Sequence, residues 1–167
     1  SLDEALVHGG IANNVKVNLI RIESDNLKNN EIKTKLKNVS GLLIPGGFGK
    51  RGTEGKISAI KYAREKKIPF LGICFGMQMA IVEFARNKLK IKNAGSSELD
   101  KKCYPVIGLI NEWDKNGKII KGTDKNLGGT MRLGLYEAKL RNNSAINKIY
   151  KSKNIRERHR HRYEVNN

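Results

Sequence analysis

The fold is decided by residues 69–85, which read PFLGICFGMQMAIVEFA. The first part, up to Ile73, is apolar and has the length of a buried strand. Beyond Gly76 the pattern changes, because apolar side chains recur at the i, i+3, i+4, i+7 and i+8 spacing of one helix face. Those positions are Met77, Ala80, Ile81, Phe84 and Ala85. The stretch therefore predicts a strand, a tight turn at Cys74 and a helix that buries this face.

Strands and helices alternate upstream of this stretch. The expected elements are a helix that ends at Gly9-Gly10, a strand over 15–22, a helix over 31–38, a strand over 41–44 and a helix over 53–67 with Ile57, Ile60 and Tyr62 inward. Strands that are apolar throughout, such as 41–44, are typical of a parallel sheet covered on both faces. We therefore predict an α/β fold with a three-layer, open, mostly parallel sheet and helices on both faces.

The pattern changes after about residue 103. The expected elements there are strands over 104–113, 133–140 and 155–165, a hairpin turn at Asn116-Gly117 and a short helix that begins at Ser144. Neither an internal repeat nor a linker interrupts the chain, so we predict a single domain over residues 1–167.

Composition excludes several classes of protein. The 167 residues include 33 Lys or Arg and 16 Asp or Glu, which gives a formal net charge of +17. The lysines are scattered, often beside asparagines, which indicates a solvated surface rather than a nucleic-acid-binding stripe. No apolar run approaches the ~20 residues of a membrane span, and no signal peptide is visible. Two cysteines are too few for a disulfide framework and favour a reducing, cytoplasmic environment.

Cys74 lies between two glycines, in Gly72-Ile73-Cys74-Phe75-Gly76. This is the cysteine version of a nucleophile turn, in which flanking glycines allow one side chain to be lifted above the sheet. The positive end of the following helix would stabilise a thiolate, and the Phe75 N–H would face a developing oxyanion. The alternative is a buried structural cysteine whose glycines allow close packing. Cys103 matches no site.

A glycine-rich loop, PGGFGKRG at residues 45–52, follows the other apolar strand. Dense glycines let backbone N–H groups point together at a phosphate or an oxyanion, although the Lys-Ser/Thr ending of a nucleotide-binding loop is absent. A flexible turn is the alternative. Both loops follow the carboxyl ends of expected parallel strands, where open sheets bind their ligands.

Four segments make the sequence recognisable. They are Pro45–Gly49 with Arg51-Gly52, Leu71–Gln78, Gly128–Gly134, and Glu157–Asn167. With them the chain resembles the class I (triad) glutamine amidotransferases, and among these the glutaminase domains of CTP synthases. The cysteine turn is shared with GMP synthetases, whereas the last two segments are specific. The resemblance implies a flavodoxin-like version of the predicted fold.

The resemblance also implies roles for individual residues. Cys74 would attack the side-chain amide of glutamine to give a γ-glutamyl thioester and ammonia, with oxyanion N–H groups from Gly47 and Phe75. The glutamine pocket would be formed by Gly47, Phe75, Gly76, Met77 and Gln78, with Glu98 at the substrate ammonium and Arg162 at its α-carboxylate. A carboxylate and a forked cation suit the two ends of an amino acid. No metal or other cofactor would be needed in this domain.

The resemblance leaves the catalytic base unassigned. Its family takes the base and the orienting acid from a His-x-Glu pair beyond the Arg-His-Arg-His-Arg strand, and the histidines here are His8, His159 and His161. We therefore expect a glutaminase domain without its final C-terminal segment and without the N-terminal synthetase domain, weak or inactive alone. The full enzyme would be a cytoplasmic homotetramer that uses ATP, Mg²⁺ and UTP, with GTP as activator, and aminates UTP to CTP.

Two other functions stay open from sequence. One is the glutaminase domain of another triad amidotransferase, similar to GMP synthetase, and the other is a non-catalytic basic module that binds nucleic acid. Strand alternation puts Arg156, Arg158, Arg160 and Arg162 on one face. No row of aromatic residues accompanies them as a stacking platform, so we expect no nucleic-acid partner and no membrane partner.

Overall fold

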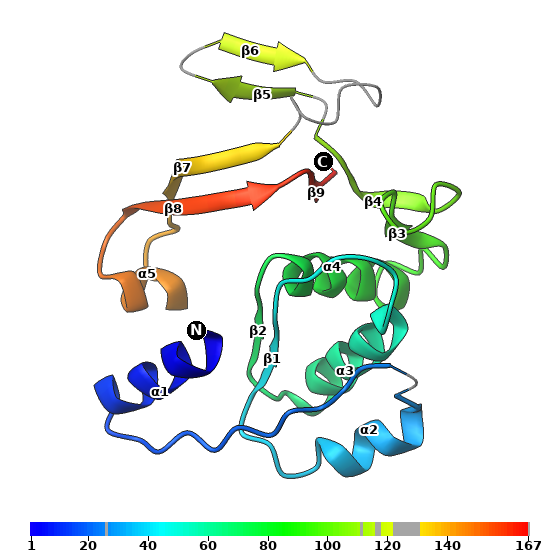
Figure 1. The fold of residues 1–167 in the computed structure, drawn as a ribbon, viewed down its shortest axis with the longest axis vertical. Coiled ribbons are helices and arrows are strands. Elements are labelled where there is room, and N and C mark those ends of the chain that lie inside the picture. The colour runs from blue at the N-terminus through cyan, green and yellow to red at the C-terminus, as the bar shows by residue number, and fades with distance from the viewer. Residues whose placement is uncertain (26, 111, 116–117, 122–130, 167) are drawn as a thin grey trace.

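The computed structural model describes residues 1–25, 27–110, 112–115, 118–121 and 131–166 (Figure 1). The helices are α1 (Leu2–Ala12), α2 (Asn29–Lys35), α3 (Thr53–Lys66), α4 (Phe75–Asn87) and α5 (Ala145–Tyr150). The strands are β1 (Leu42–Ile44), β2 (Phe70–Gly72), β3 (Ala94–Ser96), β4 (Tyr104–Leu109), β5 (Glu112–Lys115), β6 (Lys118–Lys121), β7 (Arg132–Lys139), β8 (Asn154–His161) and β9 (Tyr163–Val165).

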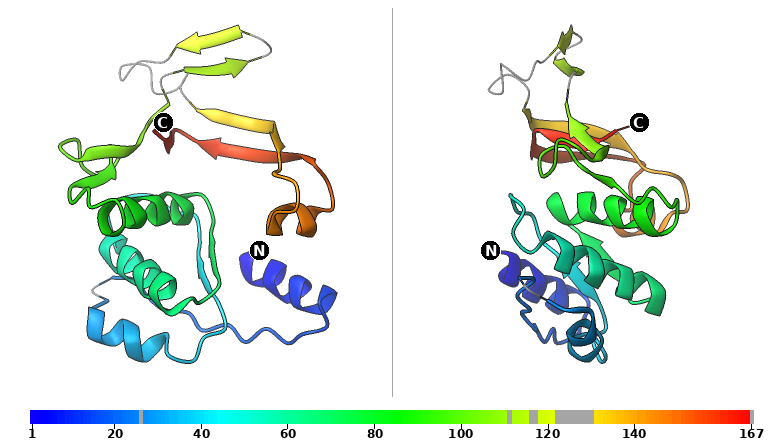
Figure 2. Two further views of the ribbon diagram at one scale, coloured as in Figure 1. Left: turned by 180° about the vertical axis from the view of Figure 1, so that it is seen from behind. Right: turned by 90° about the vertical axis from the view of Figure 1, so that its right-hand side faces the viewer.

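The core lies where α3 and α4 pack against β1 and β2. The two strands pair in parallel, with Leu42 opposite Phe70 and Ile44 opposite Gly72. The helices α3 and α4 lie side by side next to this pair (Figures 1 and 2). The buried residues of the main cluster are Ile44, Ile57, Ile60, Phe75, Met79, Val82 and Ile107. Because the last residue of β1 and the first of α4 belong to one cluster, the core fixes the turn between β2 and α4.

Three further small sheets lie outside this core. β3 pairs with β4 in parallel, and β4 pairs with β9 in antiparallel orientation. β5 and β6 form a second antiparallel pair. β7 and β8 form a third, which runs from Arg132 opposite His161 to Lys139 opposite Asn154. The expected start of α5 is confirmed, since the Ser144 hydroxyl accepts the N–H of Asn147 at 3.1 Å.

The predicted α/β fold is confirmed, but the single three-layer sheet is not found among the described residues. Parallel pairing is limited to β1–β2 and β3–β4, and the strands are divided among four small sheets. Residues 15–22, predicted as a strand, form none. A strand needs a neighbour for its backbone N–H and C=O groups, and this segment is paired with none of the described strands.

The first helix also differs from the prediction, because α1 continues through both glycines to Ala12. Gly10 is buried, and a Cβ there would lie 2.8 Å from the Val15 carbonyl oxygen and from a methyl group of Val17. Gly10 is therefore required because residues Val15 and Val17 pack closely against it, and it does not end the helix.

The buried face of α4 is rotated from the predicted one. Met77 and Phe84 are 41% and 47% exposed, whereas Met79 and Val82 are almost completely buried. Of the predicted face, Ala85 is buried, and Ala80 and Ile81 pack partly against the core. The helix carries apolar residues on nearly every side, so that spacing alone allows more than one rotation.

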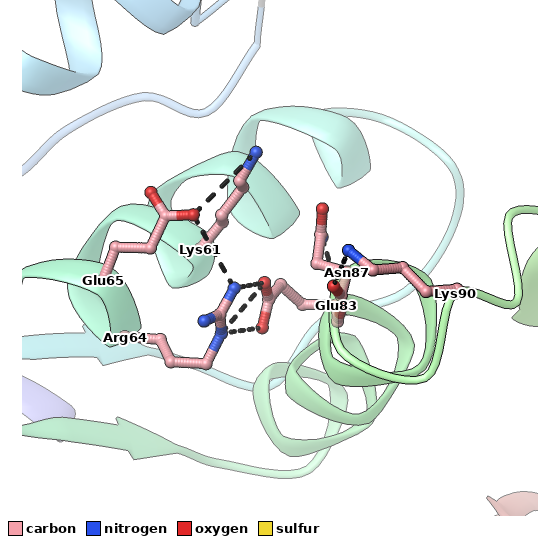
Figure 3. A network of polar contacts seen from close by, with 6 residues as sticks. All are labelled: Lys61, Arg64, Glu65, Glu83, Asn87 and Lys90. Carbon is pink, nitrogen blue, oxygen red and sulfur yellow. Dashed lines mark hydrogen bonds and ion pairs between the residues drawn. The ribbon is translucent and has the colours of Figure 1, made fainter.

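An ion pair with a buried carboxylate joins α3 and α4 (Figure 3). The Glu83 carboxylate is 1% exposed and receives the Arg64 guanidinium through both oxygens, with N···O distances of 2.8–3.2 Å. Its hydrogen bonds to Glu83 raise the pKa of Arg64. Exposed partners surround the pair, among them Glu65 at 3.9 Å from Arg64 and Lys61 at 4.0 Å from Glu65. These three hydrogen bonds hold α4 against α3 at one point.

Two expected features lie outside the described residues, namely the hairpin turn at 116–117 and residues 128–130 of the third sequence segment. Within the described ranges, none of the helices has the length and apolar character that a membrane crossing requires.

Candidate active site

Cys74 occupies the turn that joins β2 to α4. Its backbone has φ 51° and ψ −105°, a conformation that is costly for any residue with a side chain. Hydrogen bonds from Gly76 N–H to the Ile73 carbonyl at 2.9 Å and from Gln78 N–H to the Cys74 carbonyl at 3.1 Å hold the turn. The side chain is exposed and its thiol is free. This is the geometry of a nucleophile turn, and it argues against a buried structural cysteine.

The glycines on both sides of Cys74 are required by close contacts. A Cβ on Gly76 would lie 2.1 Å from the carbonyl oxygen of Ile44, at the end of β1. A Cβ on Gly72 would lie 2.6 Å from the backbone nitrogen of Met77. The turn thus depends on α4 approaching both strands at backbone distance, which no larger residue allows.

The glycine-rich loop passes beside the nucleophile. A Cβ on Gly46 would lie 3.6 Å from the Cys74 Cβ, whereas one on Gly47 would meet no atom within 4 Å. The loop ends at the first turn of α3. The backbone of Gly49, in the same loop, acts on Glu98 by lowering the pKa of its carboxyl.

Glu98 lies in the turn after β3, and its carboxylate is partly buried. Burial raises the pKa of this carboxyl above its ordinary value of 4.5, and the hydrogen bond from Gly49 opposes the shift. A carboxylate with little competing solvent is well suited to a positively charged group.

At Phe75, the side chain and the backbone N–H have different roles. The Phe75 side chain is in the core, with the Lys56 ammonium 5.8 Å from the ring centroid. Its N–H is at the first helical position and has no partner within the helix, so only this group is available to a substrate. Met77 is exposed, whereas Gln78 is buried and its amide donates to the Tyr163 carbonyl at 2.9 Å.

Arg162 lies at the break between β8 and β9, next to Tyr163. Its carbonyl accepts the N–H of Ile110 at 2.9 Å. The bond between Gln78 and Tyr163 brings this break to the first turn of α4. Among the described residues, no hydrogen bond joins the Arg162 side chain to Glu98 or to Cys74. The structure thus brings the glycine-rich loop beside Cys74 and links Gln78 to the residue that follows Arg162.

Comparison with known proteins shows the family of this chain. All 167 residues match the family described as "Glutamine amidotransferase class-I". The chain belongs to the class-I glutamine amidotransferase family. It is 76% identical over 166 residues to a CTP synthase of Pelagibacter ubique and 54% identical over 169 residues to one of Zymomonas mobilis. In both cases the match covers 99% of this chain and 31% of the relative, so the chain spans about a third of the curated relatives' length.

A solved structure of the family has the same fold. The glutaminase domain of the Trypanosoma brucei CTP synthase, solved with bound acivicin, superposes with a TM-score of 0.83 at 33% identity. That match covers 99% of this chain and 61% of the other chain. The likeness extends over both the Cys74 turn and the β7–β8 pair.

Two backbone groups beside the candidate site residues were missed by sequence reasoning, that of Gly49 next to Glu98 and the Tyr163 carbonyl next to Gln78. Both are backbone groups, and every residue except proline has them, so side-chain identity gives no signal for them. Among the described residues no cluster of three or more His, Cys, Asp or Glu side chains could hold a metal ion. That this domain needs no cofactor stays a prediction.

Proposed function

We propose that the chain hydrolyses glutamine through Cys74, as the glutaminase part of a CTP synthase. The observation that carries the proposal is the exposed thiol in a strained turn at the start of α4, beside the glycine-rich loop. The 76% identity to a CTP synthase makes this particular enzyme the best-supported choice.

The chemistry follows from the position of the thiol. The Cys74 thiolate attacks the side-chain amide carbon of glutamine, and the oxyanion that forms is bound by the N–H groups of Phe75 and Gly47. The intermediate collapses to a γ-glutamyl thioester as the amide nitrogen takes a proton and leaves as ammonia. Water then cleaves the thioester to glutamate. We assign the proton transfers to a His-x-Glu pair of the longer protein, since the resemblance implies one.

Recognition of the substrate would use its two charged ends. Glu98 accepts the α-ammonium and Arg162 binds the α-carboxylate, while Gly76, Met77 and Gln78 form the floor of the pocket. The partial burial of Glu98 supports its role, because a charge is bound more strongly where water is excluded.

In the longer protein the ammonia would be used by an N-terminal synthetase domain. That domain would aminate UTP to CTP with ATP and Mg²⁺, under activation by GTP, in a cytoplasmic homotetramer whose reducing surroundings keep both thiols free. We also infer that the parallel pairs β1–β2 and β3–β4 belong to a three-layer, flavodoxin-like sheet there. The relatives of greater length support this extension.

Other functions have less support. A GMP synthetase-like amidotransferase would share Cys74 and would differ in the nucleotide that the longer protein aminates. A nucleic-acid-binding face on β8 is weakened because Arg156 is paired with Glu137 at 2.6 Å. We expect neither nucleic acid nor a membrane as a partner.

Alkylation tests the proposed nucleophile. A glutamine analogue with an alkylating group should label Cys74, and Cys74→Ala should lower glutaminase activity by roughly 10³-fold or more in the complete open reading frame. Cys103→Ala is the matched control. Burial, followed by the charge of Asp100, raises the pKa of the Cys103 thiol above its ordinary value of 9.0, so this thiol stays protonated and unreactive at pH 8. Labelling at Cys103, or full activity in Cys74→Ala, contradicts the proposal.

A further inference from the structure

A chain of hydrogen bonds connects two histidines to the backbone beside Arg162. The rings of His159 and His161 are joined between Nδ1 and Nε2 at 3.0 Å. The other nitrogen of His161, Nδ1, lies 3.1 Å from the Tyr163 carbonyl oxygen. The same oxygen accepts the amide of Gln78 from α4 at 2.9 Å. The chemistry proposed above gives these histidines no task.

Only one assignment of protons satisfies this chain while both rings are neutral. A carbonyl oxygen can only accept, so the Nδ1 of His161 carries a hydrogen. Neutral His161 then has a bare Nε2, which accepts from Nδ1–H of His159. The bonds therefore run in one direction, from His159 to His161 and on to Tyr163.

This chain of hydrogen bonds fixes the backbone at Arg162. The His161 side chain bonds to a carbonyl two residues later, so that it closes a ring over the Arg162 main chain. The Arg162 carbonyl is held separately by Ile110 N–H. The Gln78 bond then ties this ring to the helix that begins after Cys74. The main chain on both sides of Arg162 is thereby held relative to the nucleophile helix.

We propose that His161, oriented by His159, is a positioning residue that sets Arg162 for the α-carboxylate of glutamine. This rests on the proposed function. Neither histidine touches the substrate, so their effect should appear in the affinity for amino acids and not in the reactivity of the thiol.

The surroundings of His159 favour the neutral form of its ring. His159 faces Tyr136 and Arg132 of β7, with the Tyr136 ring 5.3 Å away and Arg132 paired with Glu164 at 2.6 Å. Burial, followed by the charge of Arg132 and the neighbouring ring of His161, lowers the pKa of His159 below its ordinary value of 6.5, while Glu164 and Glu157 oppose the shift.

Two substitutions at one position test the proposal in the complete open reading frame. His161→Asn places its amide nitrogen where Nδ1 stood and keeps the bond to Tyr163, whereas His161→Leu loses it. We expect His161→Leu to raise the KM for glutamine about tenfold, the effect of one hydrogen bond, with kcat within about twofold. His161→Asn should stay within about threefold of wild type. His8→Leu, on α1, is the matched control and should change neither constant.

A second readout separates positioning from loss of structure. Iodoacetamide has no α-carboxylate, so it should label Cys74 at the same rate in wild type and in His161→Leu, while an alkylating glutamine analogue should label the variant about tenfold more slowly. Any one of three results would overturn this inference and leave the proposed function standing. They are equal effects of His161→Leu and His161→Asn, an unchanged KM in His161→Leu, and loss of iodoacetamide labelling in that variant. A wild-type protein that does not hydrolyse glutamine would overturn the proposed function as well.

Discussion

At the scale of the residue, Glu98 shows how the fold adjusts a single carboxyl group. Burial after β3 favours its neutral form, and the Gly49 N–H favours its charged form. Burial is the larger effect, so the carboxyl takes up its proton at a higher pH than a solvated glutamate does. An ammonium that binds here must therefore meet a carboxylate whose ionisation depends on pH.

Glutamine affinity should accordingly fall in acid. Binding needs ionised Glu98, so 1/KM should decrease as pH falls through its pKa, which lies above the ordinary 4.5. Glu98→Gln should raise KM by about 10–100-fold at pH 7, because one charged hydrogen bond is lost. It should also abolish this acid decrease, as measured by initial rates between pH 5 and pH 8. An unchanged pH profile in Glu98→Gln would assign the ammonium to another group.

At the scale of the element, α3 acts as the support for the nucleophile helix. Among the ion pairs between helices in the described residues, only the Arg64–Glu83 pair includes a charged group that is almost completely buried. Burying the Glu83 carboxylate is costly, and the bidentate guanidinium offsets that cost only while both groups are present. The pair therefore ties α4 to α3 at this point of the two helices.

Removal of one partner should destabilise the protein more than removal of both. We expect Arg64→Ala to lower the free energy of unfolding by about 3–5 kcal/mol, since Glu83 is left buried and unpaired. Arg64→Met combined with Glu83→Leu should be close to neutral. Lys61→Ala, which removes the exposed pair with Glu65, is the control and should cost less than about 0.5 kcal/mol. Urea unfolding followed by circular dichroism measures all three, and equal losses in the single and double variants would contradict the argument.

The same elements show what the sequence could reveal about the site. The turn at Cys74 was predictable, because a cysteine flanked by glycines between a strand and a helix is typical of a nucleophile turn. The rotation of α4 was not, since Met77, Met79 and Phe84 are all apolar, and only packing against β1 decides which are buried. Glu98 was reached through family resemblance alone. Nothing in its own neighbourhood in the sequence indicates the Gly49 bond.

At the scale of the whole molecule, strand pairing was the least predictable feature. The apolar runs at 42–44 and 70–72 indicated strands because their composition suits burial, and these strands form the parallel pair β1–β2. Residues 15–22 are also rich in apolar side chains, although they include Lys16, Asn18 and Arg21, yet none of the described strands pairs with them. Composition reports whether a segment can be buried, whereas pairing depends on which distant segment arrives beside it. The break of the last strand at Arg162 is likewise set by contacts with α4 and β4.

The arrangement of the three histidines leads to a prediction about the 167 residues expressed alone. His8 lies on α1, and His159 and His161 are bonded to each other and to the Tyr163 carbonyl, so none is available as the base for Cys74. We expect ammonia release from glutamine at no more than about 10⁻³ of the rate of the complete open reading frame, because a nucleophile without its base loses most of its power. A coupled glutamate dehydrogenase assay measures the release, with Cys74→Ala in the same chain as background. Turnover within about tenfold of the complete frame would mean that one of these histidines leaves its bonds and acts as the base.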